Sequence, residues 1–147
     1  VIQKRFMIYL FFRFLNKVRS AESVYAHCDI PCGIYTTEPM VTAARTVARM
    51  VEKAGEADSS DVHAISRFTA VKEEHAQLCK DQLLILWTDY FKPEHLEMFP
   101  ELHRVCWEAA KLCSKVKQEG TVAAAQELEQ AVSQIAEMFE KAEALKE

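Results

Sequence analysis

The sequence has 147 residues, half of them apolar, with a formal net charge of −4 and only three glycines and four prolines. This length fits one domain, and so few turn-forming residues argue against an all-β fold and favour long helices. The charge is unevenly divided: residues 1–26 hold five basic residues and one acidic residue, so the remaining residues carry −8. An acidic domain of this kind is a poor binder of nucleic acid, and we expect no nucleic-acid partner.

Residues 1–26 have the pattern of a segment that is removed after synthesis. Lys4 and Arg5 precede an apolar run at 6–12, and Val24-Tyr25-Ala26 is similar to an A-x-A cleavage site. The apolar run is too short to cross a bilayer as a helix, so we expect no membrane contact in the mature form. We therefore predict a cleaved leader or propeptide at 1–26. A secretory signal and an organellar presequence are both compatible with this composition.

The chemically most distinctive segment reads His27-Cys28-Asp29-Ile30-Pro31-Cys32-Gly33-Ile34-Tyr35. The two cysteines are three residues apart, and no second pair follows at the spacing of a zinc ribbon. A proline and a glycine within the segment favour a tight turn. We predict an irregular metal-binding hook at 27–35, in which His27, Cys28 and Cys32 are the ligands. A disulfide between the two cysteines is the alternative in an oxidised, metal-free form.

The rest of the chain shows the periodicity of helices. Apolar residues recur at three- and four-residue spacing, and four helices are predicted at about 39–54, 61–90, 100–119 and 121–146. Pro39 suits a first helical turn, Pro93 ends the second helix and Gly120 ends the third, with 92–99 as a connection. Short connections favour an antiparallel up-and-down four-helix bundle, so the predicted fold is all-α, with the hook preceding the bundle.

Several further residues have a structural interpretation. Cys79, Cys106 and Cys113 fall within helical patterns and are expected to be buried free thiols. We interpret three histidines as surface or capping residues: His63, His95 and His103. Three apolar residues of the last connection are expected on the surface, where they would need a partner: Leu96, Met98 and Phe99.

The hook resembles that of the nickel-containing superoxide dismutases, whose pattern H-C-x-x-P-C-G-x-Y it matches at every fixed position. A second match is Trp87-Thr88-Asp89-Tyr90-Phe91-Lys92-Pro93-Glu94-His95, followed by P-E-L-H at 100–103. The family carries W-x-D-Y-F-K-P-x-H and then P-E-L-H. The resemblance covers roughly 27–147. It implies an enzyme that binds one nickel ion per chain and converts superoxide and protons to oxygen and hydrogen peroxide.

The resemblance also implies roles for individual residues. The α-amine of His27 and the next backbone nitrogen would bind nickel with the two thiolates, and the imidazole would add an axial nitrogen. Because that amine must be free, a dedicated protease would have to cut after Ala26. Tyr35 and Tyr90 would line the approach to the metal. Two residues are weaker candidates around the ligands: Asp29, through its backbone N–H, and Lys92, as local positive charge.

At two positions the sequence departs from part of the family. Some members have a glutamate in the first helix that hydrogen-bonds the ligand imidazole, paired with an arginine in the second helix. Matching outward from the two motifs places Ala43 and His75 at these positions. Ala43 cannot make that hydrogen bond, so His75 is either part of a rebuilt surrounding of the hook or an ordinary helix residue.

The resemblance implies a homohexamer, and we expect the mature chain in the cytoplasm, or exported if the leader is a secretory signal. Two other functions are compatible with the helices: a nickel or copper carrier that uses the hook without turnover, and a structural bundle in which the hook is only a loop. The two tyrosines favour the enzyme, because a storage site needs no gate for a substrate.

Overall fold

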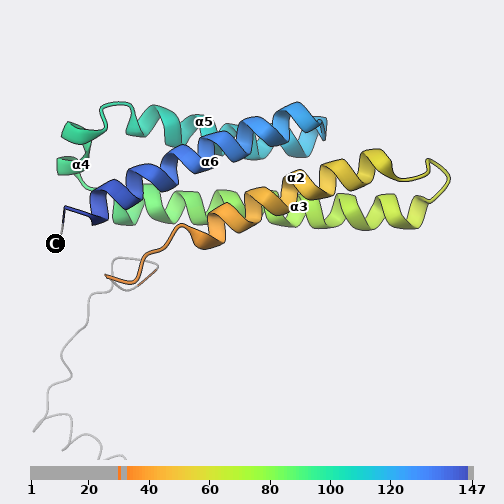
Figure 1. Ribbon diagram of the computed structural model, residues 1–147, viewed down its shortest axis with the longest axis horizontal. Helices are drawn as coiled ribbons and strands as arrows, with labels where there is room; N and C mark the ends of the chain where they lie inside the picture. Colours follow the sequence, from red (N-terminus) through yellow and green to blue (C-terminus); the bar gives the residue numbers. More distant parts are fainter. Residues whose placement is uncertain (1–29, 31–32, 146–147) are drawn as a thin grey trace, which may run out of the picture.

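The computed structural model describes residue 30 and residues 33–145. Its elements are α2 (Glu38–Glu56), α3 (Val62–Ile85), the π-helical turn η1 (Leu86–Tyr90), α4 (Pro93–Met98), α5 (Leu102–Glu119) and α6 (Val122–Glu143). No strand occurs in this described part. The helix pairs α2–α3 and α5–α6 form two antiparallel hairpins, which pack through α2 against α6 and α3 against α5 (Figure 1). The predicted all-α four-helix bundle is confirmed. Most of the predicted hook lies outside the described residues.

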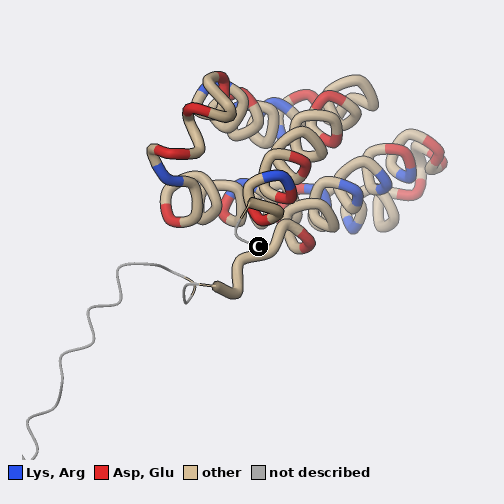
Figure 2. The backbone as a smooth tube through the Cα atoms, turned by 60° about the vertical axis from the view of Figure 1, so that its left-hand side comes forward, with Lys and Arg blue, Asp and Glu red and all other residues tan. Residues whose placement is uncertain are grey.

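The core follows from the apolar stripes of the helices. In α2 the buried side chains recur at helical spacing: Met40, Ala43, Ala44, Val47 and Val51. Cys79, Cys106 and Cys113 are buried free thiols, as predicted, and burial raises the pKa of the Cys106 thiol to about 12. Charged residues of both signs are spread along the helices (Figure 2). None of the described helices is both long enough and apolar enough to span a membrane.

Local capping residues mark the starts of α3 and α6 and the end of α5. The Asp61 carboxylate accepts the Ala64 N–H at 2.9 Å and begins α3, and the Thr121 hydroxyl accepts the Ala124 N–H at 3.3 Å and begins α6. Gly120 ends α5 in the left-handed conformation at φ 61°, which the absence of a Cβ permits. This is the end that the glycine predicted.

The connection expected at 92–99 is different in the structure. It contains the short helix α4, which begins at Pro93 and is capped by His95, whose Nδ1 accepts the Lys92 N–H at 3.0 Å. His95 is therefore a capping residue but a buried one. Phe99 is also buried, so its expected exposure was wrong, whereas Met98 is exposed. The His95 ring packs against Tyr90 and Phe91, which the sequence of the segment alone could not show.

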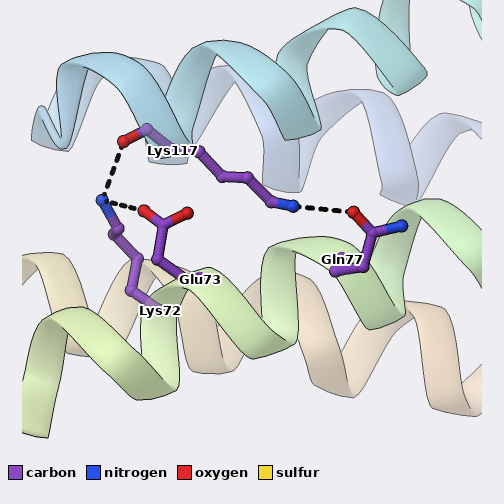
Figure 3. Close-up of polar contacts among 4 residues, drawn as sticks. All are labelled: Lys72, Glu73, Gln77 and Lys117. Atoms are coloured by element: carbon purple, nitrogen blue, oxygen red, sulfur yellow. Dashed lines mark hydrogen bonds and ion pairs between the residues drawn. The ribbon is translucent and has the colours of Figure 1, made fainter.

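A buried lysine joins α3 to the end of α5. Lys72 is only 8% exposed, and its Nζ donates to the Lys117 carbonyl at 3.1 Å and pairs with Glu73 at 2.9 Å (Figure 3). The Lys117 side chain donates back to Gln77 on α3 at 2.7 Å. The Lys117 carbonyl lies in the last helical turn, where carbonyl groups lack partners within the helix and the helix dipole favours a cation.

We expect Lys72→Met to lower the free energy of unfolding by about 1–3 kcal/mol, because it leaves the Lys117 carbonyl without its charged donor. Urea unfolding followed by circular dichroism would measure the change. Lys115→Met is the matched control: it removes an exposed ion pair with Glu127, which is 2.7 Å long, and should cost less than about 1 kcal/mol. Equal losses in the two variants would contradict the role given to Lys72.

Candidate functional site

Two tyrosines from distant parts of the sequence meet at one end of the bundle. Tyr35 belongs to the segment before α2, and Tyr90 is the last residue of η1. Their ring centroids are 5.6 Å apart, and the rings meet edge to face at 60°. Tyr90 is buried and Tyr35 half-buried. The structure thus brings together the two tyrosines that the sequence predicts beside the metal. Tyr35 is the last residue of the predicted hook at 27–35.

The position of Tyr90 depends on the π-helical turn that ends α3. The Phe91 N–H donates to the Leu86 carbonyl, five residues earlier, at 3.0 Å. The Thr88 hydroxyl donates to the Leu84 carbonyl at 2.7 Å, a side-chain contact that competes with the helical ladder. Such a turn holds an extra residue, so it moves the side chains at its end around the helix axis, and it occurs often at functional sites.

Tyr90 is held by rings on several sides and by a carboxylate. The centroids of Phe139, Phe91 and His95 lie 4.4, 5.0 and 5.6 Å from its own, and His95 is stacked at 16°. The hydroxyl donates to Oε1 of Glu143 on α6 at 2.5 Å. Burial, and then the hydrogen bond to Glu143, raise the pKa of Tyr90 above its usual value. The phenol is therefore protonated at neutral pH.

The other candidate residues occupy more varied positions. Lys92 is exposed, two residues after Tyr90. His75 is half-buried, and its Nδ1 contacts the Val71 carbonyl of its own helix at 3.0 Å, so this nitrogen carries the hydrogen. Ala43 is buried in α2. It lies 13 residues before the end of that helix, and His75 lies 13 residues after the start of α3. The antiparallel hairpin therefore places these two departures from the family at the same level.

The proposed ligands His27, Cys28 and Cys32, and the neighbouring Asp29, lie outside the described residues. Within residues 30 and 33–145 no group of three or more His, Cys, Asp or Glu side chains could hold a metal ion. The donor set in the sequence, one imidazole with two thiols, fits nickel, which accepts nitrogen and soft sulfur ligands.

Glu143 and His95 are contacts of Tyr90 that the sequence did not reveal. Glu143 lies 53 positions from Tyr90 and belongs to no motif. The one available signal is that it follows Phe139 by four residues, so that both lie on one face of α6. His95 is part of the second motif, but nothing in that motif separates a residue that stacks on tyrosine from a surface cap.

The fold and the paired tyrosines define a helical-bundle protein with a site at one end, and comparisons with known proteins identify its family. A family model described as nickel-containing superoxide dismutase matches residues 22–143. A superoxide dismutase (Ni) of Streptomyces seoulensis is 40% identical over 116 residues, which are 79% of this chain and 87% of the relative. The protein of the same name from Streptomyces coelicolor is 38% identical over 117 residues, 80% of this chain and 88% of the relative.

Solved structures agree with this result. A crystal structure of Ni-containing superoxide dismutase with nickel ligation of the oxidised state has a TM-score of 0.74 and 37% identity, covering 80% of this chain and 99% of that one. An apo structure of nickel superoxide dismutase has a TM-score of 0.72 and 33% identity, covering 76% and 99%. The chain belongs to the nickel-containing superoxide dismutase family.

The raised pKa of Tyr90 makes the stability of the protein depend on pH in the alkaline range. The folded state keeps the phenol proton at a pH where the unfolded chain, with its pKa near 10.0, releases it. The stabilisation from Tyr90 is therefore full below pH 10 and is lost as the pH rises toward the raised value. We expect the difference in unfolding free energy between the parent and Tyr90→Phe to shrink from about pH 9 to about pH 11.5. Urea titrations at a series of pH values would test this, and a constant difference would contradict it.

Proposed function

We propose that the chain is a nickel superoxide dismutase, which converts two superoxide anions and two protons to oxygen and hydrogen peroxide. The observation that carries the proposal is the hook pattern directly before Tyr35, whose ring meets Tyr90 at 5.6 Å. In the sequence Cys32 stands three residues before Tyr35, so the ligand pattern and one tyrosine of the pair belong to the same short segment. A carrier would need the thiols but no such pair, which favours the enzyme over metal storage.

The thiolates of the hook and the two tyrosines have different roles in the proposed site. His27, Cys28 and Cys32 would hold the nickel ion, which when bound would supply the redox chemistry. Cys28 and Cys32 provide soft thiolate donors, which bring the potential of the metal into the range that dismutation needs. The rings of Tyr35 and Tyr90 form an apolar wall, and their hydroxyl groups order water and admit only small anions. Because Tyr90 keeps its proton at neutral pH, it adds no negative charge to repel the substrate.

Superoxide is an anion and the domain is acidic, so attraction must come from charge near the site. Lys92 is exposed and follows Tyr90 by two residues. Screening limits the reach of an exposed charge to about 8–10 Å at physiological salt. We therefore infer that Lys92 contributes to local steering of superoxide, whereas the net charge of the domain contributes little.

We further infer that residues 1–26 are a leader that a protease removes, because the amine of His27 is a ligand only when it is the chain terminus. The proposal places the processed chain in the cytoplasm, and export is the alternative if the leader is a secretory signal. Fractionating cells and locating the chain that begins at His27 distinguishes the two.

Assembly as a homohexamer is proposed on the same basis, and it is supported by exposed apolar side chains near the tyrosine pair. Ile34 is 65% exposed and Leu145 is 69% exposed, one residue from Tyr35 and two residues from Glu143 respectively. A second copy of the chain would cover such side chains. Sedimentation of the nickel-loaded chain would measure the number of copies.

The proposed function predicts that a nickel-loaded chain beginning at His27 consumes superoxide, and that the same chain retaining Ala26 does not. The added residue turns the His27 amine into an amide, which is a much poorer ligand. Pulse radiolysis would measure the rate, with nickel content determined in parallel. Cys28→Ser is the control for the metal, because a hydroxyl is a harder ligand than a thiolate, and Cys79→Ser should leave nickel content unchanged. Equal rates with and without Ala26 would contradict the role of the amine.

His75 gives a second test, because it stands at the level of Ala43, where part of the family has charged partners. If its imidazole supports the hook, His75→Ala should lower the rate or the nickel affinity by roughly 10- to 100-fold, the usual scale for such partners. His63→Ala is the matched control, since His63 is an exposed histidine near the other end of the same helix. An unchanged rate with unchanged helicity would make His75 an ordinary residue of the bundle.

A further inference from the structure

Glu143 makes a contact to the candidate site from the last turn of α6. Its Oε1 accepts the Tyr90 hydroxyl at 2.5 Å, at the short end of the range for a hydrogen bond to a carboxylate. Phe139 lies one turn earlier on the same helix, and its ring centroid is 4.4 Å from that of Tyr90. One face of α6 therefore contacts both the ring and the hydroxyl of this tyrosine.

The ring contacts and the carboxylate fix different things. Stacked and edge-to-face rings limit where the Tyr90 ring can lie, but they are weak and only loosely directional. They do not set the direction of the hydroxyl hydrogen. A hydrogen bond to a carboxylate is strong and directional, and a phenol has only one hydrogen to give. With that hydrogen given to Glu143, the Tyr90 oxygen offers only acceptor lone pairs to its other neighbours.

We propose that Glu143 is a positioning residue for dismutation, a role that rests on the proposed function. The carboxylate holds the Tyr90 hydroxyl, so that Tyr90 presents an acceptor on the approach to the hook. A water bound to this oxygen is then turned with a hydrogen toward Tyr90, and its second hydrogen is available to the reaction. Without Glu143 the Tyr90 hydroxyl could rotate and donate its hydrogen to the water instead. The water would then no longer be oriented with a hydrogen toward Tyr90.

A double-mutant cycle separates this role from a structural one. In the nickel-loaded, processed chain, Glu143→Ala should lower the rate constant for superoxide about 10-fold. Glu143→Gln should retain it to within about 3-fold, because the amide oxygen still accepts a hydrogen bond. In a Tyr90→Phe background, Glu143→Ala should change the rate by less than about 2-fold, since residues that act through one contact are not additive. Glu140→Ala, an exposed glutamate in the same turn of α6, is the matched control and should leave the rate unchanged.

A second measurement does not depend on turnover. The full chain has four tyrosines, and labelling their Cζ atoms with ¹³C gives signals that respond to the hydrogen bond of each phenol. In the metal-free chain, the signal absent from Tyr90→Phe identifies Tyr90. It should move in Glu143→Ala, move less in Glu143→Gln and stay in place in Glu140→Ala.

An unmoved Tyr90 signal in both Glu143 variants would overturn the proposal. The proposal would also be overturned if Glu143→Ala lowered the rate constant about 10-fold in the Tyr90→Phe background, as it does in the parent. If Glu143→Ala unfolds, Glu143→Gln provides the test, because it preserves the length and shape of the side chain. The Tyr90 Cζ signal in that variant then decides. A parent chain that binds nickel without consuming superoxide would contradict the proposed function, and the carbon signal would still show whether Glu143 holds Tyr90.

Discussion

The site end of the bundle depends on the π-helical turn with which α3 ends. The extra residue in that turn, closed by the hydrogen bond from Phe91 to Leu86, sets the direction in which Tyr90 leaves the helix. Every other contact of the site follows from that direction. Tyr35 meets the ring from the segment before α2, His95 stacks on it from α4, and Glu143 reaches its hydroxyl from α6. Three separate segments of the chain thus converge on the phenol that η1 presents.

A second constraint is electrostatic. The domain is acidic, yet its family acts on an anion, and charges of both signs are interspersed along the helices (Figure 2). The site contains a carboxylate, Glu143, whose Oε1 accepts a hydrogen bond from the Tyr90 hydroxyl at an O···O distance of 2.5 Å. The hydrogen bond keeps Tyr90 protonated and neutral, so the pair carries a single negative charge, on the carboxylate. The carboxylate therefore orders the phenol without ionising it.

The sequence predicted features that depend on residues close together in the chain. It missed features that depend on residues far apart in the chain. Gly120 and Pro93 act on backbone groups a few residues away, so these two residues located the end of α5 and the interruption after the second helix. The two motifs located Tyr35 and Tyr90, although the contact between them became visible only in the fold. The buried stacking of His95 and the contact of Glu143 arise from tertiary packing, and the π-helical turn departs from the regular helical period. No local periodicity encodes these features, and the ligands of the hook, which lie outside the described residues, remain assigned from their residue types.

The turn between α2 and α3 lies at the opposite end of the bundle from α4 (Figure 1). It is closed by its own hydrogen bonds, in which Asp58 accepts the N–H and the hydroxyl of Ser60 at 2.8 and 2.7 Å, and its residues are largely exposed. Nothing in it touches the tyrosine pair, because the full length of α3 separates them. The tyrosine pair therefore restricts which residues can change at one end of the bundle, and the turn between α2 and α3 at the other end has no such restriction. Affinity tags, fluorophores or inserted peptides belong at residues 57–61, where a longer loop costs little entropy and the chemistry is a helix length away.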